Sequence, residues 1–237
     1  MSIPRAASAV RATGEKRPAV IPVADILAAL EGTYGPRPFV SRGRAVDVLV
    51  ETVLSQNTSD VNSHRAFLSL LERFGSLEAV ADARVEDIER AIAGAGLSRI
   101  KSVRIKELLS RLAGENGSLD LSFLAGRGVD AARSYLISFK GVGLKTASCV
   151  LLFSLGLPAM PVDTHVHRVC RRLGLIGAGV SAESAHAALE AMVAPADRYR
   201  FHLLVIEHGR RTCHARYPRC NVCPLAQTCP SALVKPA

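Results

Sequence analysis

Hydrophobic side chains recur along this sequence with the period of an α-helix, and this periodicity constrains the fold more than any other feature. The stretch from Val46 to Leu54 has apolar residues at i, i+3, i+4, i+7 and i+8, which puts them on one face of a helix. Similar stripes run from Ile105 to Leu112 and from Phe201 to His208. No segment shows sustained two-residue alternation, and no Asn-Gly or Asp-Gly turn joins two strand-like runs. The sequence therefore predicts an all-α protein of about ten to twelve helices.

The charge balance favours an acidic partner. Lys and Arg number 30 against 21 Asp and Glu, a net charge of +9. Such an excess suits a nucleic acid, because neutralised phosphates release their counterions, although an ordinary basic enzyme would also fit. No apolar run is long enough to span a bilayer, so we expect no membrane protein. Residues 1–20 lack a secretory apolar core and carry three Arg, which predicts a disordered basic tail or, as the alternative, a short transit peptide.

Four cysteines near the C-terminus predict a metal centre. Cys213, Cys220, Cys223 and Cys229 have the spacing C-x6-C-x2-C-x5-C. A disulfide framework would need an oxidising compartment, and nothing in the N-terminal sequence indicates secretion. Zinc remains an alternative, but zinc sites of this kind usually pair two short hooks, and only Cys220 and Cys223 form one. An iron–sulfur cluster with one thiolate per iron tolerates the wider spacing.

A second motif, Ser138-Phe-Lys-Gly-Val-Gly-Leu-Lys-Thr-Ala147, predicts a tight hairpin between two helices. We expect one helix to end near Phe139 and the next to begin about Leu144. The glycines let the backbone approach a ligand, and the N–H groups at the second helix form a potential phosphate site. A plain helix–helix connection is the alternative. Lys145 falls in the first turn of the second helix, where a cation is disfavoured and a neutral, nucleophilic amine is favoured.

A third motif, Pro161-Val-Asp-Thr-His-Val-His-Arg168, places Asp163 eighteen residues after Lys145. Asp163 and Thr164 are both good N-cap residues for the helix expected to run through Val169 and Leu173. A purely structural cap and a functional carboxylate are compatible, since a cap fixes the direction of the carboxylate. Cys149 and Cys170 lie in apolar helical stretches, where we expect buried, unreactive thiols.

Together these motifs resemble those of the helix-hairpin-helix Gly/Pro-Asp DNA glycosylases, and the cysteine spacing resembles the [4Fe–4S] loop of the endonuclease III branch. The resemblance covers about residues 25–230. It implies two helical domains with the active site in the cleft between them. One domain would be a six-helix bundle of residues 41–157 with the hairpin, and the other would combine residues 21–40 and 158–237 around the cluster.

The resemblance also implies roles for individual residues. Lys145 matches the lysine that attacks C1′ of the damaged nucleotide. Asp163 matches the paired aspartate, which would stabilise the oxocarbenium-like sugar and help to deprotonate the lysine. The phosphate clamp corresponds to Gly141, Val142 and Gly143. Contacts to the DNA backbone or to the gap left by a flipped base are implied for Gln56 or Asn57, Leu97, Lys140, His165, Arg216 and Arg219.

Some residues depart from this pattern. The usual Leu-Pro before the hairpin is Phe139-Lys140 here. Glu51 falls where adenine mismatch glycosylases keep a general acid, but those enzymes lack a lysine at the position of Lys145, so a bystander role is the first interpretation. The hairpin sequence also resembles the catalytic core of plant 5-methylcytosine DNA glycosylases, which puts the preferred base in question.

The resulting hypothesis is a base-excision repair enzyme that removes damaged bases, oxidised pyrimidines first, and cuts the abasic site by β-elimination. We expect a monomer in the bacterial cytoplasm that acts on double-stranded DNA. Two alternatives remain. One is a monofunctional glycosylase or lesion binder that acts on another base, and the other is a non-catalytic DNA-binding module.

Overall fold

The computed structural model describes residues 21–233, and this part of the chain is helical, without a β-strand. The all-α class is therefore confirmed, and the eleven α-helices agree with the predicted number. Four 3-10 helices, η1 to η4, accompany them. The tail predicted for residues 1–20 lies outside the described residues. The α-helices are α1 (Val23–Tyr34), α2 (Ala45–Leu54), α3 (Asp60–Phe74), α4 (Leu77–Asp82), α5 (Val85–Ala91), α6 (Ser98–Asn116), α7 (Val129–Ile137), α8 (Leu144–Phe153), α9 (Thr164–Arg172), α10 (Ala182–Met192) and α11 (Arg198–Arg211).

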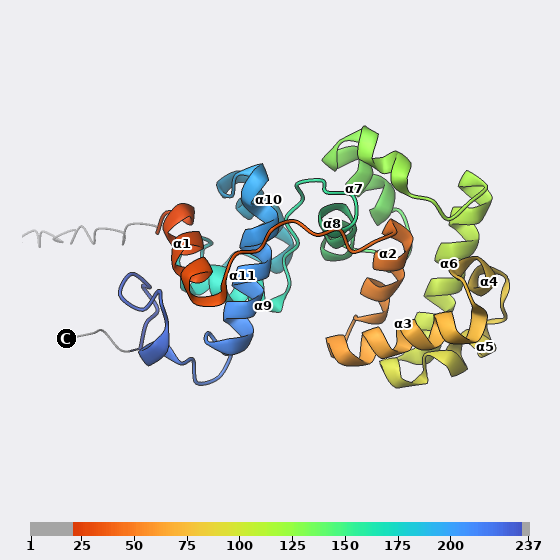
Figure 1. Ribbon diagram of the computed structural model, residues 1–237, viewed down its shortest axis with the longest axis horizontal. Coiled ribbons are helices and arrows are strands. Elements are labelled where there is room, and N and C mark those ends of the chain that lie inside the picture. The colour runs from red at the N-terminus through yellow and green to blue at the C-terminus, as the bar shows by residue number, and fades with distance from the viewer. Residues whose placement is uncertain (1–20, 234–237) are drawn as a thin grey trace, which may run out of the picture.

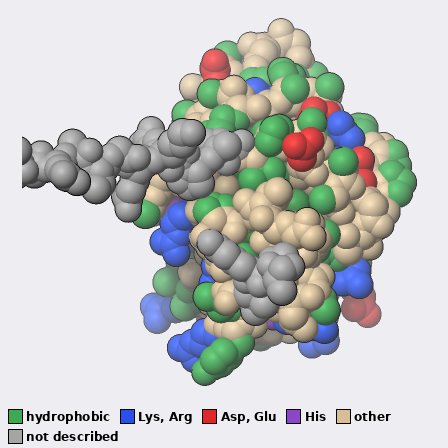
Figure 2. All heavy atoms as spheres, turned by 90° about the vertical axis from the view of Figure 1, so that its left-hand side faces the viewer, with side chains coloured by type: hydrophobic (Ala, Val, Ile, Leu, Met, Phe, Trp, Pro, Cys, Tyr) green, Lys and Arg blue, Asp and Glu red, His purple; other side chains and the backbone are tan. Residues whose placement is uncertain are grey.

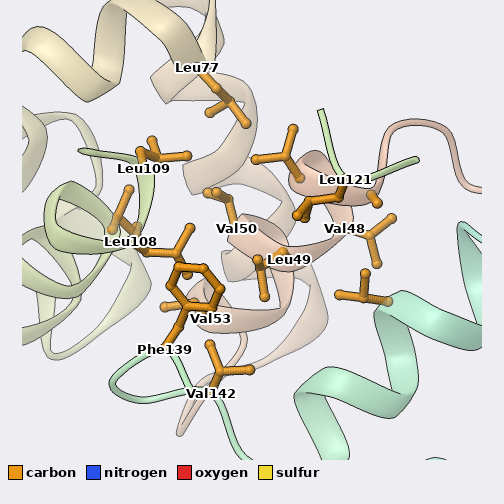
Figure 3. Close-up of a cluster of buried hydrophobic side chains, with 14 of the residues drawn as sticks. Val48, Leu49, Val50, Val53, Leu77, Leu108, Leu109, Leu121, Phe139 and Val142 are labelled. Atoms are coloured by element: carbon orange, nitrogen blue, oxygen red, sulfur yellow. The ribbon is translucent and has the colours of Figure 1, made fainter. Parts of the chain in front are cut away.

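The buried apolar side chains form two clusters. The first cluster draws on α2 to α8, and Figure 3 shows part of it, with side chains of α2 facing those of α6. The second cluster draws on α1, α9, α10 and α11 together with Leu225 in the C-terminal loop. The expected helical stripes lie in these clusters: Leu49 and Ile105 are fully buried in the first, and Phe201 is fully buried in the second. Figure 1 shows the matching groups of helices, with α8 at the boundary between them.

Two connecting segments run between the clusters, residues 35–44 and 154–163. The first connection is held to the end of α8, because the N–H of Arg42 donates to the carbonyl of Phe153 at 2.8 Å. A second contact across the boundary is the ion pair of Arg133 on α7 with Glu190 on α10, at 2.5 Å, and both side chains are largely buried. These contacts fix the relative position of the elements that meet at the boundary.

The hairpin between α7 and α8 is anchored by two apolar side chains. Phe139 and Val142 are 2% and 5% exposed, and both point into the first cluster (Figure 3). Burial of these side chains leaves the intervening backbone at the surface. Phe139 thus keeps an apolar anchor in the place of the family's leucine.

The surface charge is unevenly distributed. On the end of the molecule seen in Figure 2, most of the Lys and Arg side chains lie in the lower half, whereas Asp and Glu gather in the upper half. No helix within residues 21–233 is long and apolar enough to cross a membrane.

Candidate active site

A cavity of about 360 Å³ lies where the two clusters meet. Its walls come from α2, α3, α8 and α11 and from the turn before α9. Lys145 and Asp163, which are separated by a helix and a loop in the sequence, both line it. The cavity also contains charged and polar groups that the sequence motifs did not identify. It is therefore a polar cleft within the size range of small-molecule binding sites.

Lys145 is the second residue of α8, as expected from the hairpin motif. Gly143 caps this helix with an extended backbone, and the side chain of Lys145 is half-buried at the cavity wall. One turn further along α8, Cys149 is 5% exposed and its pKa is raised by burial. Its thiol is thus buried, as the sequence predicted, although the residue lines the cavity.

Asp163 is the N-cap of α9, and its Oδ1 accepts a hydrogen bond from the N–H of Val166 at 2.7 Å. The structural interpretation of this residue is therefore correct. Within the described residues, no donor contacts the second carboxylate oxygen. The cap holds one oxygen in the helix terminus and leaves the other available to the cavity.

His202 of α11 also lines the cavity, and nothing in the sequence motifs indicated it. Its ring is 1% exposed, packs edge-on against Phe153 at 5.3 Å and makes a 2.9 Å hydrogen bond from Nδ1 to the carbonyl of Pro161. Burial lowers the pKa of His202 to about 4, although the nearby Asp163 carboxylate acts in the opposite direction. At neutral pH the ring is therefore uncharged.

Two polar pairs lie on the outer part of the cavity. Glu51 of α2 contacts Nδ1 of His64 on α3 at 2.8 Å through its Oε1. Arg210 of α11 forms an ion pair with Asp60 at the start of α3 and thus bridges the two sides of the cleft. Glu51 lies beside the cavity, as its sequence position suggested, and the His64 contact gives its carboxylate a partner.

The hairpin has the geometry of an anion site. Gly141 has φ +84°, and a Cβ there would lie 2.9 Å from Cδ of Arg104. Within residues 21–233, the N–H groups of Gly141 and Gly143 have no hydrogen-bond acceptor, and Val142 donates to the carbonyl of Phe139 at 3.0 Å. Two free N–H groups at a helix start can bind a phosphate oxygen.

Gln56 is tied to this hairpin. Its Nε2 donates to the carbonyl of Gly141 at 2.9 Å, and its Oε1 accepts from Arg104 at 3.1 Å. The neighbouring Asn57 is exposed and has φ +55°. Of the two residues left open by the sequence, Asn57 is therefore the one that projects from the loop, and Gln56 supports the hairpin.

Leu97 projects from a second loop, with φ +53° and 53% of its surface exposed. The loop lies beside Asn57, because a Cβ on Gly96 would be 4.0 Å from the Asn57 carbonyl oxygen. Positive φ in two non-glycine residues, one with a large exposed apolar side chain, is typical of functional loops.

A buried lysine ties these two loops together. Lys101 is 1% exposed, and its Nζ donates to the carbonyls of Leu54, at the end of α2, and Ala95, in η1, at 2.6 and 2.7 Å. Lys101 lies four residues before Ile105 and therefore on the apolar face of α6. A lysine on a buried helical face is the sequence signal that could have indicated a buried hydrogen-bonding role.

The remaining candidates lie outside the cavity. His165 accepts a hydrogen bond from Arg168 at 3.1 Å, and within the described residues it makes none with Asp163. Lys140 is exposed beside Glu107, with Nζ and Oε2 3.6 Å apart. Arg216 and Arg219 are exposed on the loop between the first two cysteines of the C-terminal motif.

The four C-terminal cysteines line one cavity of about 30 Å³. Within residues 21–233, no three His, Cys, Asp or Glu side chains are close enough together to bind one metal ion. Burial raises the pKa of the Cys223 and Cys229 thiols, so a bound metal centre would be needed to hold them as thiolates. Arg172 donates to Sγ of Cys213 at 3.2 Å, the kind of N–H contact that stabilises a thiolate. Four separated thiols around one cavity suit a cluster in which each iron takes one thiolate.

Comparison with known proteins assigns the family. The family described as "HhH-GPD superfamily base excision DNA repair protein" matches residues 50–195, which include the hairpin, Lys145 and Asp163. This chain belongs to the HhH-GPD superfamily.

Several relatives within the HhH-GPD superfamily are similar over most of this chain. Endonuclease III of Thermotoga maritima is 35% identical over 183 residues, which cover 77% of this chain and 81% of that protein. An Arabidopsis thaliana protein provisionally named a DNA glycosylase is 39% identical over 165 residues, 70% of this chain and 56% of its own length. DNA glycosylase/AP lyase ROS1 of Arabidopsis thaliana is 32% identical over 169 residues, 64% of this chain. The chain spans only 12% of that plant protein.

A solved structure agrees with these relatives. A trapped endonuclease III–DNA covalent intermediate superimposes with a TM-score of 0.73 and 27% identity, covering 87% of this chain and 93% of that chain. The resemblances to the endonuclease III branch and to plant glycosylases that the sequence motifs indicated are both confirmed.

Proposed function

We propose that this HhH-GPD protein is a base-excision repair DNA glycosylase with AP-lyase activity. The observation that carries the proposal is that an amine, Lys145, and a carboxylate, Asp163, line one polar cavity. The relatives named endonuclease III and DNA glycosylase/AP lyase, and the neighbour trapped as a covalent DNA intermediate, support this chemistry.

In the proposed reaction, the damaged nucleotide leaves the base stack and enters the cavity. Nζ of Lys145 attacks C1′, and the electron pair of the glycosidic bond leaves with the base. Asp163, whose direction is set by its bond to Val166, stabilises the positive charge that develops on the sugar. Loss of a proton from Nζ and opening of the C1′–O4′ bond then give the Schiff base. Loss of a 2′ proton from this Schiff base expels the 3′ phosphate, which cuts the strand on the 3′ side. We propose oxidised pyrimidines as the first bases to test.

The DNA would be held by the hairpin and by the two loops beside it. The free N–H groups of Gly141 and Gly143 would bind a backbone phosphate, and the buried Val142 keeps them in position. Asn57 and Leu97 have the exposure and the backbone geometry of residues that fill the gap left by a flipped base. Supporting contacts are proposed for Gln56, Lys140, His165, Arg216 and Arg219.

We propose that Cys213, Cys220, Cys223 and Cys229 bind a [4Fe–4S] cluster. When bound, the cluster would serve as a structural brace that holds the C-terminal loop, and with it Arg216 and Arg219, against the second apolar cluster. We also propose the domain division expected from the sequence, residues 41–157 and residues 21–40 with 158–237, since the two apolar clusters follow these ranges closely. We further propose a monomer that acts on double-stranded DNA in the bacterial cytoplasm, where chromosomal DNA is accessible.

The test is borohydride trapping on a duplex with one abasic site. Borohydride reduces a Schiff base to a stable amine, so an enzyme that uses Lys145 gives a covalent protein–DNA band. We expect the native protein to form this band and to cut the strand, and Lys145→Ala to bind the duplex without either reaction. Lys106→Ala is the matched control, because its amine donates to the carbonyl of Ala81 and the residue does not line the cavity.

If the native protein binds the duplex but forms no covalent band, the lyase mechanism is wrong. The alternative, a monofunctional glycosylase or lesion binder, would then hold. A band of equal intensity in Lys145→Ala would assign the nucleophile to another amine.

A further inference from the structure

Two buried titratable side chains of the cavity, Cys149 and His202, have no role in the reaction above. Burial raises the pKa of the Cys149 thiol, so this group keeps its proton and His202 is the one that can accept a proton. His202 is buried in α11, yet it lines the same cavity as Lys145 and Asp163. A buried polar ring at the base of a reactive site needs a physical reason, because its desolvation costs free energy.

The hydrogen bond to Pro161 fixes the tautomer of this ring. A carbonyl oxygen can only accept, so Nδ1 of His202 carries the proton and Nε2 of the neutral ring carries the lone pair. Within the described residues, Nε2 has no hydrogen-bond partner. Because His202 lines the cavity, Nε2 is the ring nitrogen that is left without a partner there.

The charged groups around the ring decide whether it is neutral and able to accept a proton. Asp163, Lys145 and Arg42 act on it electrostatically: the carboxylate favours the protonated ring and the two cations oppose it. The other titratable groups of the cavity wall are Cys149, Glu51, His64, Asp60 and Arg210. Burial outweighs the carboxylate, so the ring is neutral before the reaction and can accept a proton beside Asp163 during it.

We propose that His202 is the proton acceptor for the Lys145 amine. As the Nζ–C1′ bond forms and the glycosidic bond breaks, the departing base takes the electron pair and Nζ becomes positively charged. One N–H bond of Nζ then breaks, directly or through one water, and the proton moves to Nε2. The imidazolium that forms lies beside the Asp163 carboxylate, and it returns the proton to the leaving group, which is the base or, at an abasic site, the C1′ hydroxyl. This assignment rests on the proposed glycosylase/lyase function.

The test separates the cavity-facing nitrogen from the one that anchors the ring. In His202→Asn, the amide can still donate to the carbonyl of Pro161 but offers nothing at the position of Nε2. The matched control is His186→Asn in α10, because the Nδ1 of His186 makes the same kind of bond, 2.8 Å to the carbonyl of Met160, and the residue does not line the cavity. The measurement is the single-turnover rate of borohydride cross-linking on a saturating abasic duplex, from pH 5.5 to 8.5.

We expect the native protein and His186→Asn to cross-link at similar rates and with the same dependence on pH, so the slope of His202→Asn is measured relative to theirs. His202→Asn should be slower by roughly a hundredfold, the scale of a general base. Its rate should rise with pH and increase on addition of imidazole, because solvent bases must take the proton. His202→Gln, which cannot accept the proton either, should give the same slope and serves if the Asn variant does not fold.

Three outcomes would overturn the assignment. If His202→Asn matches the native rate at every pH, the ring is only an anchor. If it is slowed equally at all pH values and imidazole has no effect, the ring acts through the fold. If the native protein itself forms no cross-link, the proposed function is wrong and this role falls with it.

Discussion

Lys101→Met should loosen both of the loops that are proposed to enter the DNA. The ammonium is 1% exposed and donates to two buried carbonyl oxygens at 2.6 and 2.7 Å. Each carbonyl left without a donor costs about 1–3 kcal/mol. In the native protein, burial disfavours the charged ammonium, as the lowered pKa of Lys101 indicates. Methionine carries no charge, so its substitution offsets part of the cost of the two unpaired carbonyls. We expect a net loss of about 2–4 kcal/mol, or about 4–16 °C in Tm for a chain of this size.

The assays are thermal unfolding and cross-linking at a temperature where all variants are folded. Lys140→Met is the stability control, since that amine is exposed and should change the free energy of unfolding by less than about 0.5 kcal/mol. Leu112→Ala is the control for cross-linking: it removes a fully buried side chain from the same helix, at a similar cost of about 2–5 kcal/mol, away from the loops. Cross-linking should weaken in Lys101→Met and not in Leu112→Ala. A Tm within 1 °C of the native value would refute the argument, because the two carbonyls would then have other partners.

Three further predictions concern the cavity and the cysteines. Asp163→Asn should keep the cap of α9, because its side-chain oxygen can still accept from Val166, so the free energy of unfolding should change by less than about 1 kcal/mol. The rate of cross-linking should fall at least about a hundredfold. An unchanged rate would show that the carboxylate charge has no part in the mechanism. Between pH 6.5 and about 4 the unfolded chain binds a proton on His202 that the folded chain excludes. Acidification over this range should therefore lower the free energy of unfolding by roughly 3 kcal/mol through this residue. The pH dependence of urea unfolding should be shallower in His202→Asn. Cys220→Ser should lose iron and the visible absorption of a cluster and should lower Tm, whereas Cys170→Ser, at a buried thiol outside the motif, should keep its iron; full iron content in Cys220→Ser would disprove the ligand assignment.

Local features of this protein were predictable because they depend on residues close together in the chain. The helical stripes at Leu49 and Ile105 became buried faces, and Asp163 became the N-cap of α9, since periodicity and capping are properties of a few consecutive residues. The hairpin around Gly141 followed for the same reason, with the positive φ that a glycine allows.

Other features depend on contacts between distant segments. Gln56 and Asn57 were equivalent in the sequence, and only the hydrogen bonds of Gln56 to Gly141 and Arg104 separated the supporting residue from the projecting one. His202 and Lys101 looked like isolated polar residues on apolar helical faces. Their partners, Pro161 and Leu54, lie 41 and 47 residues away.

The sequence by itself determined the helical class, the hairpin, the cap and the set of four cysteines, because short-range geometry and chemical type decide these. The tertiary structure alone decided which side chains share the cavity, which nitrogen of His202 carries a proton and which loop residues project. These properties follow from burial and from hydrogen bonds between distant segments, and neither quantity is defined until the two apolar clusters have packed.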